Sequence, residues 1–270
     1  MKDEVSHRQM RGARVDLESV GQVFIHGQTP VTALWDMSLR IPDGQFVSLV
    51  GPSGCGKTTI LGMLSGLLKP SVGKALIDGQ TVDGPRQDVA YMFARDALMP
   101  WRSVRKNVEF GMQVRGVPAE QRRENAAKWL ERVGLARDED SPINKLSQGM
   151  RQRVAIARTL ALTPRLILMD EPFAALDAQT RALQQAHFTR LWEELNCTVI
   201  FVTHDLTEAI RLSDRVILIG SRPGRIVADL TIDIERPRQL ADAFRNPKFV
   251  EYHDYLSTRL SKEVLASGLH

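Results

Sequence analysis

Cysteines, long apolar runs and net charge are all scarce in this sequence. Cys55 and Cys197 are the only cysteines in 270 residues, which argues against a disulfide framework and favours a reducing compartment. No apolar run approaches the ~18 residues that span a bilayer, because segments such as FVSLV and LILM have only the length of strands. The N-terminal segment MKDEVSHRQMRGARVD has no apolar core, so we expect no secretory signal and a cytoplasmic location.

The balance of charges argues against nucleic acid as a partner. The chain has 36 Lys and Arg against 32 Asp and Glu, a formal net charge of +4. A charge this small suits a surface near anionic partners but does not indicate a nucleic-acid-binding protein. The length and a hydrophobic fraction of 43% are enough for one domain, with or without a subdomain.

The apolar pattern predicts strands and helices in a definite order. Apolar residues alternate with polar ones within residues 15–41, which is typical of antiparallel strands. Later, continuous apolar segments such as LILM, TVIFV and VILI alternate with amphipathic helices. That order predicts a parallel sheet flanked by helices, with ligands at the carboxyl ends of its strands.

A helical block interrupts the strands of the predicted sheet. The pattern is helical from residue 103 to residue 162, and Ser147 is well placed to cap one of the helices. Asp205 and Glu208 form a D-x-x-E capping box at the start of a later helix. From residue 221 the pattern becomes irregular, which suggests an appended tail that could regulate, dimerise or pack on the core.

A glycine-rich loop between a predicted strand and a predicted helix indicates a phosphate site. Residues 51–58, GPSGCGKT, match the pattern G-x-x-x-x-G-K-[ST], whose glycines let successive backbone N–H groups face one anion. Lys57 is expected to reach the β- and γ-phosphates, and Thr58 to ligate Mg²⁺. An ordinary glycine-rich turn is the alternative. The residues expected to hold the nucleotide are Gly51, Pro52, Ser53, Gly54, Cys55, Gly56, Lys57, Thr58 and Thr59.

Two carboxylates follow the apolar segment LILM. Asp170 is placed to hold Mg²⁺ through water, while Glu171 can orient and deprotonate a water aimed at the γ-phosphate. A solvated acidic strand end is the alternative, which the nearby phosphate loop makes weaker. The pair therefore predicts hydrolysis of a nucleoside triphosphate.

The segment LSQGMRQRVAIARTL, residues 146–160, points to a family. Together with GPSGCGKT, MDEP, AALD and VTHD, it resembles the ATP-binding cassette of ABC transporters. The resemblance implies ATP and Mg²⁺ as cofactors and an α/β P-loop NTPase (RecA-like) fold. That fold has a parallel sheet core, an antiparallel β subdomain and a helical subdomain inserted at about 98–162. The cassette would occupy residues 13–237 and the tail residues 238–270.

The resemblance also implies that two copies bind two ATP molecules head to tail. Ser147 and Gly149 would contact the γ-phosphate of the partner copy, since Ser147 caps a helix whose free N–H groups no phosphate of its own copy needs. Asp177 would link the two sites. His204 would contact the γ-phosphate and hold the attacking water, with a packing histidine as the alternative. Phe24 would stack on adenine, with a core phenylalanine as the alternative. The expected catalytic residues are Glu171, His204 and Lys57.

The sequence departs from the family's pattern in two motifs. Gln148 and Met150 stand in a loop that usually reads LSGGQ, although Gly149 is retained. Ala94 stands where the family usually has a Gln that touches Mg²⁺ and the water. We hypothesise that Asp96 or a water takes over this contact; local turn bonds are the alternative role of Asp96.

The apolar stretch ALMPW is expected to face a membrane partner. Leu98, Met99 and Trp101 would dock a short helix of a separate integral membrane permease, and burial under the helical block is the alternative. ATP would close the dimer and move this block.

Two further stretches, which are less specific than the cassette motifs, resemble import ATPases of the nitrate, sulfonate and taurine group. They are DALMPWR and SRPGRIVADLTIDIERPR. This resemblance implies uptake of a small solute that a periplasmic or extracellular solute-binding protein delivers. It also implies a peripheral place on the cytoplasmic face of the inner (plasma) membrane. No residue of such a cassette touches the transported solute, so the permease and the solute-binding protein would carry the specificity.

Two other functions compete with transport. A P-loop kinase or GTPase would explain the phosphate loop but not the later motifs. An ABC-type ATPase of DNA repair or translation would bind nucleic acid through basic residues of the helical block, although solvated helix faces explain these residues more simply. They are Arg102, Arg105, Lys106, Arg115, Arg122 and Arg123.

Overall fold

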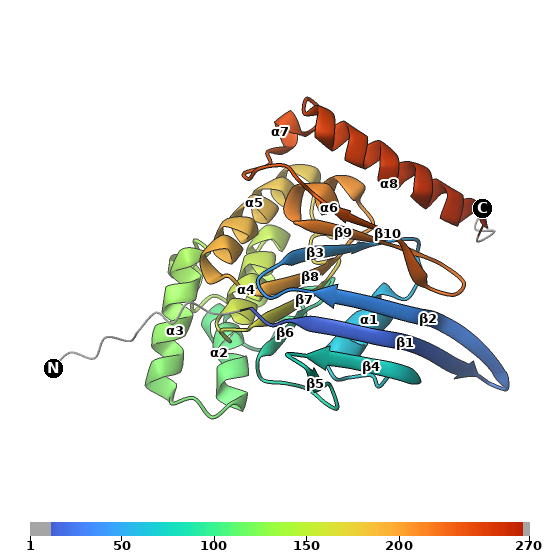
Figure 1. The fold of residues 1–270 in the computed structure, drawn as a ribbon. Helices are drawn as coiled ribbons and strands as arrows, with labels where there is room; N and C mark the ends of the chain where they lie inside the picture. The colour runs from blue at the N-terminus through green and yellow to red at the C-terminus, as the bar shows by residue number, and fades with distance from the viewer. Residues whose placement is uncertain (1–11, 267–270) are drawn as a thin grey trace.

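Two sheets and the helices around them build the protein (Figure 1). The computed structural model describes residues 12–266; most of the segment in which we expect no secretory signal lies outside this range. One sheet is antiparallel with the order β2-β1-β4-β5, and the other has the order β10-β9-β3-β8-β7-β6. Within residues 12–266, no helix combines the length and the apolar composition that crossing a bilayer requires.

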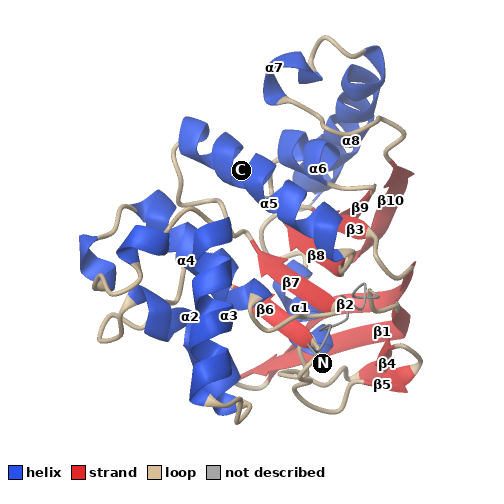
Figure 2. Ribbon diagram, turned by 90° about the vertical axis from the view of Figure 1, so that its left-hand side faces the viewer, coloured by secondary structure: helices blue, strands red, loops and turns tan. Residues whose placement is uncertain are grey.

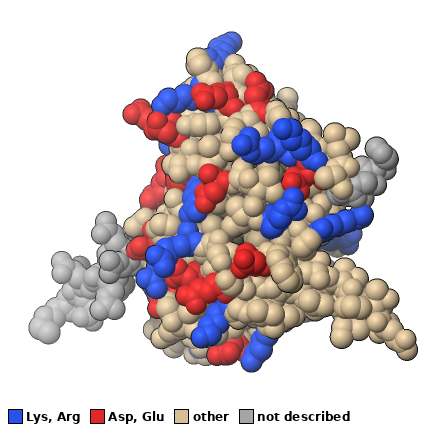
Figure 3. Space-filling view, turned by 45° about the vertical axis from the view of Figure 1, so that its right-hand side comes forward, with Lys and Arg blue, Asp and Glu red and all other residues tan. Residues whose placement is uncertain are grey.

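The antiparallel sheet forms from the alternating pattern of residues 15–41. β1 and β2 pair over most of their length, β4 lies on the other side of β1, and Val15, Leu17 and Leu39 are buried. Beyond residue 18 the β1–β2 hairpin carries no Lys, Arg, Asp or Glu until Asp36, and its end is the tan projection at the lower right of Figure 3. The strands are β1 (Val15–His26), β2 (Thr29–Ile41), β4 (Val72–Ile77) and β5 (Gln80–Thr81).

The six-stranded sheet is mostly parallel. Its parallel strands are joined at one edge by β10, which pairs antiparallel with β9. β10 forms where the sequence pattern indicated only irregular chain. The pattern missed this strand because its residues are partly buried and do not alternate cleanly between buried and exposed. The strands are β3 (Phe46–Val50), β6 (Val89–Met92), β7 (Leu166–Asp170), β8 (Thr198–Val202), β9 (Arg215–Gly220) and β10 (Arg225–Thr231).

A block of helices stands beside the β6 edge of this sheet (Figure 2). Its members α2, α3 and α4 lie between β6 and β7 in the chain, as the helical pattern predicted, and two short 3-10 turns, Ala136–Asp138 and Ile143–Lys145, join α3 to α4. The helices are α1 (Lys57–Leu64), α2 (Val104–Val114), α3 (Ala119–Arg132), α4 (Gln148–Leu160), α5 (Ala178–Leu195), α6 (Leu206–Leu212), α7 (Leu240–Ala243) and α8 (Pro247–Ala266).

Alternate residues of the parallel strands enter two cores, one on each face of the sheet. In β8, Val199 and Phe201 pack with α4 and α5, whereas Ile200 and Val202 pack with α1 and the antiparallel sheet. Burial on both faces favours strands made almost wholly of apolar residues. This explains why TVIFV and LILM are continuous apolar segments.

The C-terminal segment packs on the body of the molecule through α8. Phe249 and Leu256 are buried in a third apolar cluster together with residues of α6 and β9. Arg238 donates to backbone carbonyls at the end of α6 and after β10, which ties the start of the segment to the sheet. Of the three roles considered for the tail, packing on the core is the one that these contacts show.

Replacing Phe249 by Ala is expected to lower the free energy of unfolding by about 3–5 kcal/mol, because the cavity left in a packed cluster does not collapse fully. The Phe249 residue is only 1% exposed. Urea denaturation followed by circular dichroism measures the loss. Leu265→Ala is the control on the same helix: Leu265 is 70% exposed, and the change should stay below about 1 kcal/mol. Equal losses in both variants would contradict the docking of α8.

Candidate nucleotide-binding site

The phosphate loop joins β3 to α1 and is shaped by two glycines in the left-handed region. Gly54 has a φ of 79°, and Gly56, the residue that caps α1, has a φ of 94°. A Cβ on Gly56 would lie 2.4 Å from Leu34 Cδ2, so a larger residue does not fit there. The loop thereby presents to an anion the first N–H groups of α1, which have no acceptor within the helix.

Lys57 lies inside the loop instead of in solvent. Its Nζ donates to the carbonyl oxygens of Gly51 and Pro52 at 2.7 and 2.9 Å. Cys55 is buried beside it, with Sγ 3.6 Å from Nζ. Burial raises the pKa of the Cys55 thiol more than the nearby ammonium lowers it. The thiol is therefore protonated at neutral pH, and Cys55 fills space in the loop.

Asp170 ends β7 and faces the phosphate loop. Thr58 Oγ1 donates to Asp170 Oδ1 at 3.4 Å, and the Tyr91 hydroxyl donates to Oδ2 at 3.2 Å. Burial and the Asp170 charge raise the pKa of the Tyr91 phenol, so it remains a donor. Oxygen atoms of this kind suit Mg²⁺. Since no three His, Cys, Asp or Glu side chains converge in the described chain, phosphate and water oxygens would have to complete the shell of the metal.

Glu171 directly follows β7 in a strained backbone conformation. Its φ is 45°, in the left-handed region, and its N–H donates to Val202 O at 3.0 Å. His204 Nδ1 lies 3.2 Å from Glu171 Oε2. The ends of two neighbouring strands thus hold a carboxylate and an imidazole side by side. This is an arrangement that can orient and deprotonate a water.

A buried polar network supports the loop that carries His204. The Glu208 carboxylate accepts from Thr203 Oγ1 at 2.6 Å and from Gln185 Nε2 at 2.7 Å. Arg211 donates to Gln185 Oε1 at 3.0 Å. Side chains of α5 and α6 are therefore joined behind the loop, and they restrict where the imidazole can lie.

The start of α6 differs from the predicted capping box. Asp205 caps the helix as expected, because its carboxylate accepts from two N–H groups of the first turn. Glu208 does not reach back to the Asp205 N–H, which donates to Thr203 Oγ1 instead. The prediction of the reciprocal bond, from the Asp205 N–H to Glu208, is therefore wrong. The Glu208 carboxylate accepts from Thr203 and Gln185 instead.

One cavity of about 430 Å³ brings together most of the predicted nucleotide residues. Phe24 is half-buried and lines this cavity instead of the core. A second pocket of about 40 Å³, large enough for a water, is lined by Glu171, His204 and Glu208 among others. The residues that line the larger cavity are Phe24, Ala33, Ser53, Gly54, Gly56, Lys57, Thr58, Thr59 and Glu171.

Ser147, Gly149 and Asp177 lie outside this cavity in the described chain. Ser147 caps α4 as predicted and accepts from the Met150 N–H at 3.2 Å. A Cβ on Gly149 would lie 2.8 Å from Thr180 Cγ2, so the start of α4 approaches the start of α5. There the Asp177 carboxylate accepts from the Thr180 N–H at 3.0 Å, and this bond lowers the pKa of Asp177. Both Ser147 and Asp177 are exposed, so a second molecule can reach them.

The loop after β6 does not direct Asp96 toward Asp170. Asp96 Oδ1 accepts from the Leu98 N–H at 3.2 Å, and its Oδ2 lies 3.6 Å from Arg151 Nε. Ala94 is exposed and has no polar side chain. These contacts favour the local role of Asp96 over the metal contact.

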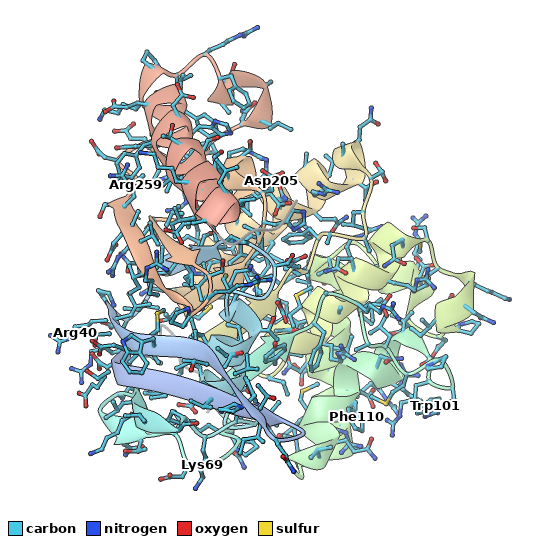
Figure 4. All side chains as sticks on the ribbon, turned by 90° about the vertical axis from the view of Figure 1, so that its right-hand side faces the viewer. Arg40, Lys69, Trp101, Phe110, Asp205 and Arg259 are labelled. Carbon is cyan, nitrogen blue, oxygen red and sulfur yellow. The ribbon has the colours of Figure 1, made fainter. Side chains whose placement is uncertain are left out.

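The expected docking stretch is only partly on the surface. Leu98 is 8% exposed and belongs to the core of the helical block, so the expectation that it faces a partner is wrong. The Met99 N–H donates to Asn107 at 2.8 Å, because α2 folds over the stretch in a way that local spacing cannot show. Trp101 is 79% exposed and stands at the outer edge of the helical block (Figure 4).

Three residues of the site were missed at the level of sequence. Tyr91 looks like one more apolar residue of a buried strand, and only its hydroxyl distinguishes it. Gln185 and Arg211 are polar residues among the mostly apolar buried residues of α5 and α6. A polar side chain inside an apolar stripe needs a partner, and this was the available signal.

Comparisons with known proteins decide the family. A profile described as ABC transporter matches residues 34–174. The uncharacterized ABC transporter ATP-binding protein MJ0412 of Methanocaldococcus jannaschii is 45% identical, over 98% of this chain and 98% of its own. The chain belongs to the ABC transporter family. The cassette is therefore an ATP-hydrolysing subunit coupled to transport, as predicted.

Other relatives of the cassette are named as import proteins. The nitrate import ATP-binding protein NrtD of Synechocystis is 39% identical over 91% of the cassette and 94% of its own length. The taurine import ATP-binding protein TauB of Yersinia pseudotuberculosis is 42% identical over 86% of the cassette and 94% of its own length.

Solved structures confirm the predicted fold class. The dimeric structure of the ATP-binding cassette MJ0796 bound to ADP and Pi is 32% identical with a TM-score of 0.72, covering 82% of this cassette and all of that chain. The structure of cbiO1 from Clostridium perfringens has a TM-score of 0.73 at 24% identity, covering 92% of this cassette and 97% of that chain, and shows the fold alone.

Proposed function

We propose that the cassette energises uptake of a small solute of the nitrate, sulfonate or taurine type through a separate membrane permease. The named import relatives and the stretch DALMPWR support this assignment. The cassette would be a peripheral subunit on the cytoplasmic face of the inner (plasma) membrane. A periplasmic or extracellular solute-binding protein would deliver the solute to the permease.

The observation that carries the proposal is the cavity that joins Phe24, the phosphate loop and Glu171 while Ser147 stays outside it. In this cavity Phe24 would stack on adenine, and Lys57 with the loop N–H groups would bind the phosphates. The site would then be open on one side. The exposed Ser147 of a second copy, placed head to tail, and the Gly149 beside it would close the site over the γ-phosphate.

Hydrolysis would use the residues at the ends of β7 and β8. Thr58 and, through water, Asp170 would hold Mg²⁺, which neutralises phosphate charge when bound. Glu171 would accept the proton of the attacking water, and His204 would hold that water against the γ-phosphate. Asp177 would transmit the state of one site to the other across the dimer.

Replacing Trp101 by Glu is expected to lower the fraction of the cassette bound to native membranes about tenfold or more, as the loss of a central aromatic contact does at interfaces. Sedimentation with native membranes at moderate salt measures this fraction. Leu265→Glu is the control: Leu265 is comparably exposed and apolar, but it lies at the end of α8, far from the helical block.

Equal sedimentation of the wild type and Trp101→Glu would reject docking at this residue. Retention on nucleic acid that falls steeply with salt would instead favour an ATPase of DNA repair or translation. Mass spectrometry of the proteins that co-purify with the wild type would identify the permease and the solute-binding protein. Those two proteins carry the solute specificity.

A further inference from the structure

The two oxygens of the Asp170 carboxylate have different neighbours. Oδ1 accepts from Thr58 Oγ1 at 3.4 Å, on the side of the phosphate loop. Oδ2 accepts from the Tyr91 hydroxyl at 3.2 Å. Among residues 12–266, these two hydroxyls are the only side-chain donors to Asp170. Oδ1 therefore faces the phosphate loop and Thr58, while Oδ2 is held by Tyr91 on the other side.

The sheet itself sets the position of the Tyr91 hydroxyl. Tyr91 pairs with Leu168 across β6 and β7, so Asp170, two residues further along β7, lies on the same face. The tyrosine ring also packs on Phe93, with ring centroids 4.5 Å apart. A donor on a strand and packed in this way is directed at Oδ2 with little freedom to turn away.

No other side chain near the end of β6 is available for this task. Ala94 has a methyl side chain, and Asp96 is engaged with the Leu98 N–H and lies beside Arg151. A carboxylate held by Thr58 alone could rotate about its terminal bond, and its two oxygens would then exchange places. The Tyr91 hydroxyl prevents that exchange.

We propose that Tyr91 is a positioning residue for the metal site, whose hydroxyl holds Asp170 Oδ2 so that Oδ1 stays directed at Thr58 and the bound Mg²⁺. The inference rests on the proposed function, in which Asp170 holds the metal through water. Partners that orient a metal-binding carboxylate in this way typically change metal affinity by about 10- to 100-fold when they are removed.

Tyr91→Phe removes one hydroxyl and keeps the ring that packs on Phe93. In the full chain, the Mg²⁺ concentration at half-maximal ATP turnover is expected to rise about tenfold, while kcat at saturating Mg²⁺ stays close to that of the wild type. A loss caused only by poor folding would lower kcat at every Mg²⁺ concentration. Tyr255→Phe, on α8, is the matched control and should change neither quantity.

A second readout does not depend on turnover. Mn²⁺ and ATP are bound to protein that carries Glu171→Gln, and the electron paramagnetic resonance spectrum of Mn²⁺ is recorded with and without Tyr91→Phe. The spectrum is expected to shift toward that of Mn²⁺·ATP in solution when the hydroxyl is missing. An unchanged spectrum together with an unchanged Mg²⁺ requirement would overturn the role of Tyr91.

Asp170→Asn separates this inference from the proposed function. If Asp170→Asn alters the Mn²⁺ spectrum and Tyr91→Phe does not, the metal assignment stands and only the role of Tyr91 falls. If Asp170→Asn also leaves the spectrum as it is in Glu171→Gln alone, Asp170 does not serve the metal, and both the metal assignment and the role of Tyr91 fail.

Discussion

Glu171→Gln is expected to lower ATP turnover by about a hundredfold or more, the range found when a positioned general base is lost. Gln has the size and shape of Glu but cannot accept the proton of the attacking water. Nucleotide binding should persist, because Lys57 and the loop N–H groups are untouched. Phosphate release measures turnover, and a fluorescent ATP analogue measures binding.

The backbone at Glu171 makes this result specific to the proton acceptor. The φ of 45° and the hydrogen bond from the Glu171 N–H to Val202 O fix the side chain beside His204. Both are properties of the backbone, so they are kept in Glu171→Gln. Glu131→Gln, on the exposed side of α3, is the control and should turn over ATP as the wild type does. Wild-type turnover in Glu171→Gln would show that a group other than Glu171 accepts the proton.

Mixing equal amounts of two inactive variants is expected to restore turnover to about a quarter of the wild-type value, if protomers pair at random in two-fold dimers and an intact site works at its full rate. Coupling of the two sites through Asp177 would lower the recovery below a quarter. Lys57→Ala disables the phosphate loop of its own copy. Ser147→Asp keeps an oxygen that caps α4 but places a negative charge where the γ-phosphate of the other copy would lie. In a mixed head-to-tail dimer, one site carries both changes and the other carries neither.

Turnover measured against the mixing ratio tests this pairing, with native mass spectrometry to show that the protomers exchange. Each variant alone should be close to inactive. Proven exchange without any recovery of turnover would reject the head-to-tail arrangement. Full activity of Ser147→Asp by itself would show that no second copy is needed at the γ-phosphate.

Local chemistry explains which parts of the site were predictable. The phosphate loop depends on glycines at positions such as Gly56, where the backbone conformation and the nearby Leu34 exclude other residues. Ser147 and Asp205 were predicted as helix caps because a cap needs only its own turn. The alternation within residues 15–41 predicted antiparallel strands because one face of that sheet is buried.

The parts that were not predictable depend on residues far away in the chain. Leu98 was expected on the surface because its neighbours in sequence do not reveal that the helical block covers it. Glu208 was assigned to a local cap, whereas Gln185 on α5 supplies the donor that it accepts. Tyr91 meets Asp170 only because β6 and β7 are adjacent in the sheet. Each of these contacts exists only in the folded molecule.

The hairpin side of the cavity bears on which nucleotide the cassette prefers. Phe24 and Ala33, the two hairpin residues that line it, have no hydrogen-bonding side chain. An aromatic face stacks on any purine, whereas telling adenine from guanine takes donors and acceptors at the edge of the base. These two residues therefore offer the base a stacking surface and no side-chain donor or acceptor, a contact that adenine and guanine would make equally.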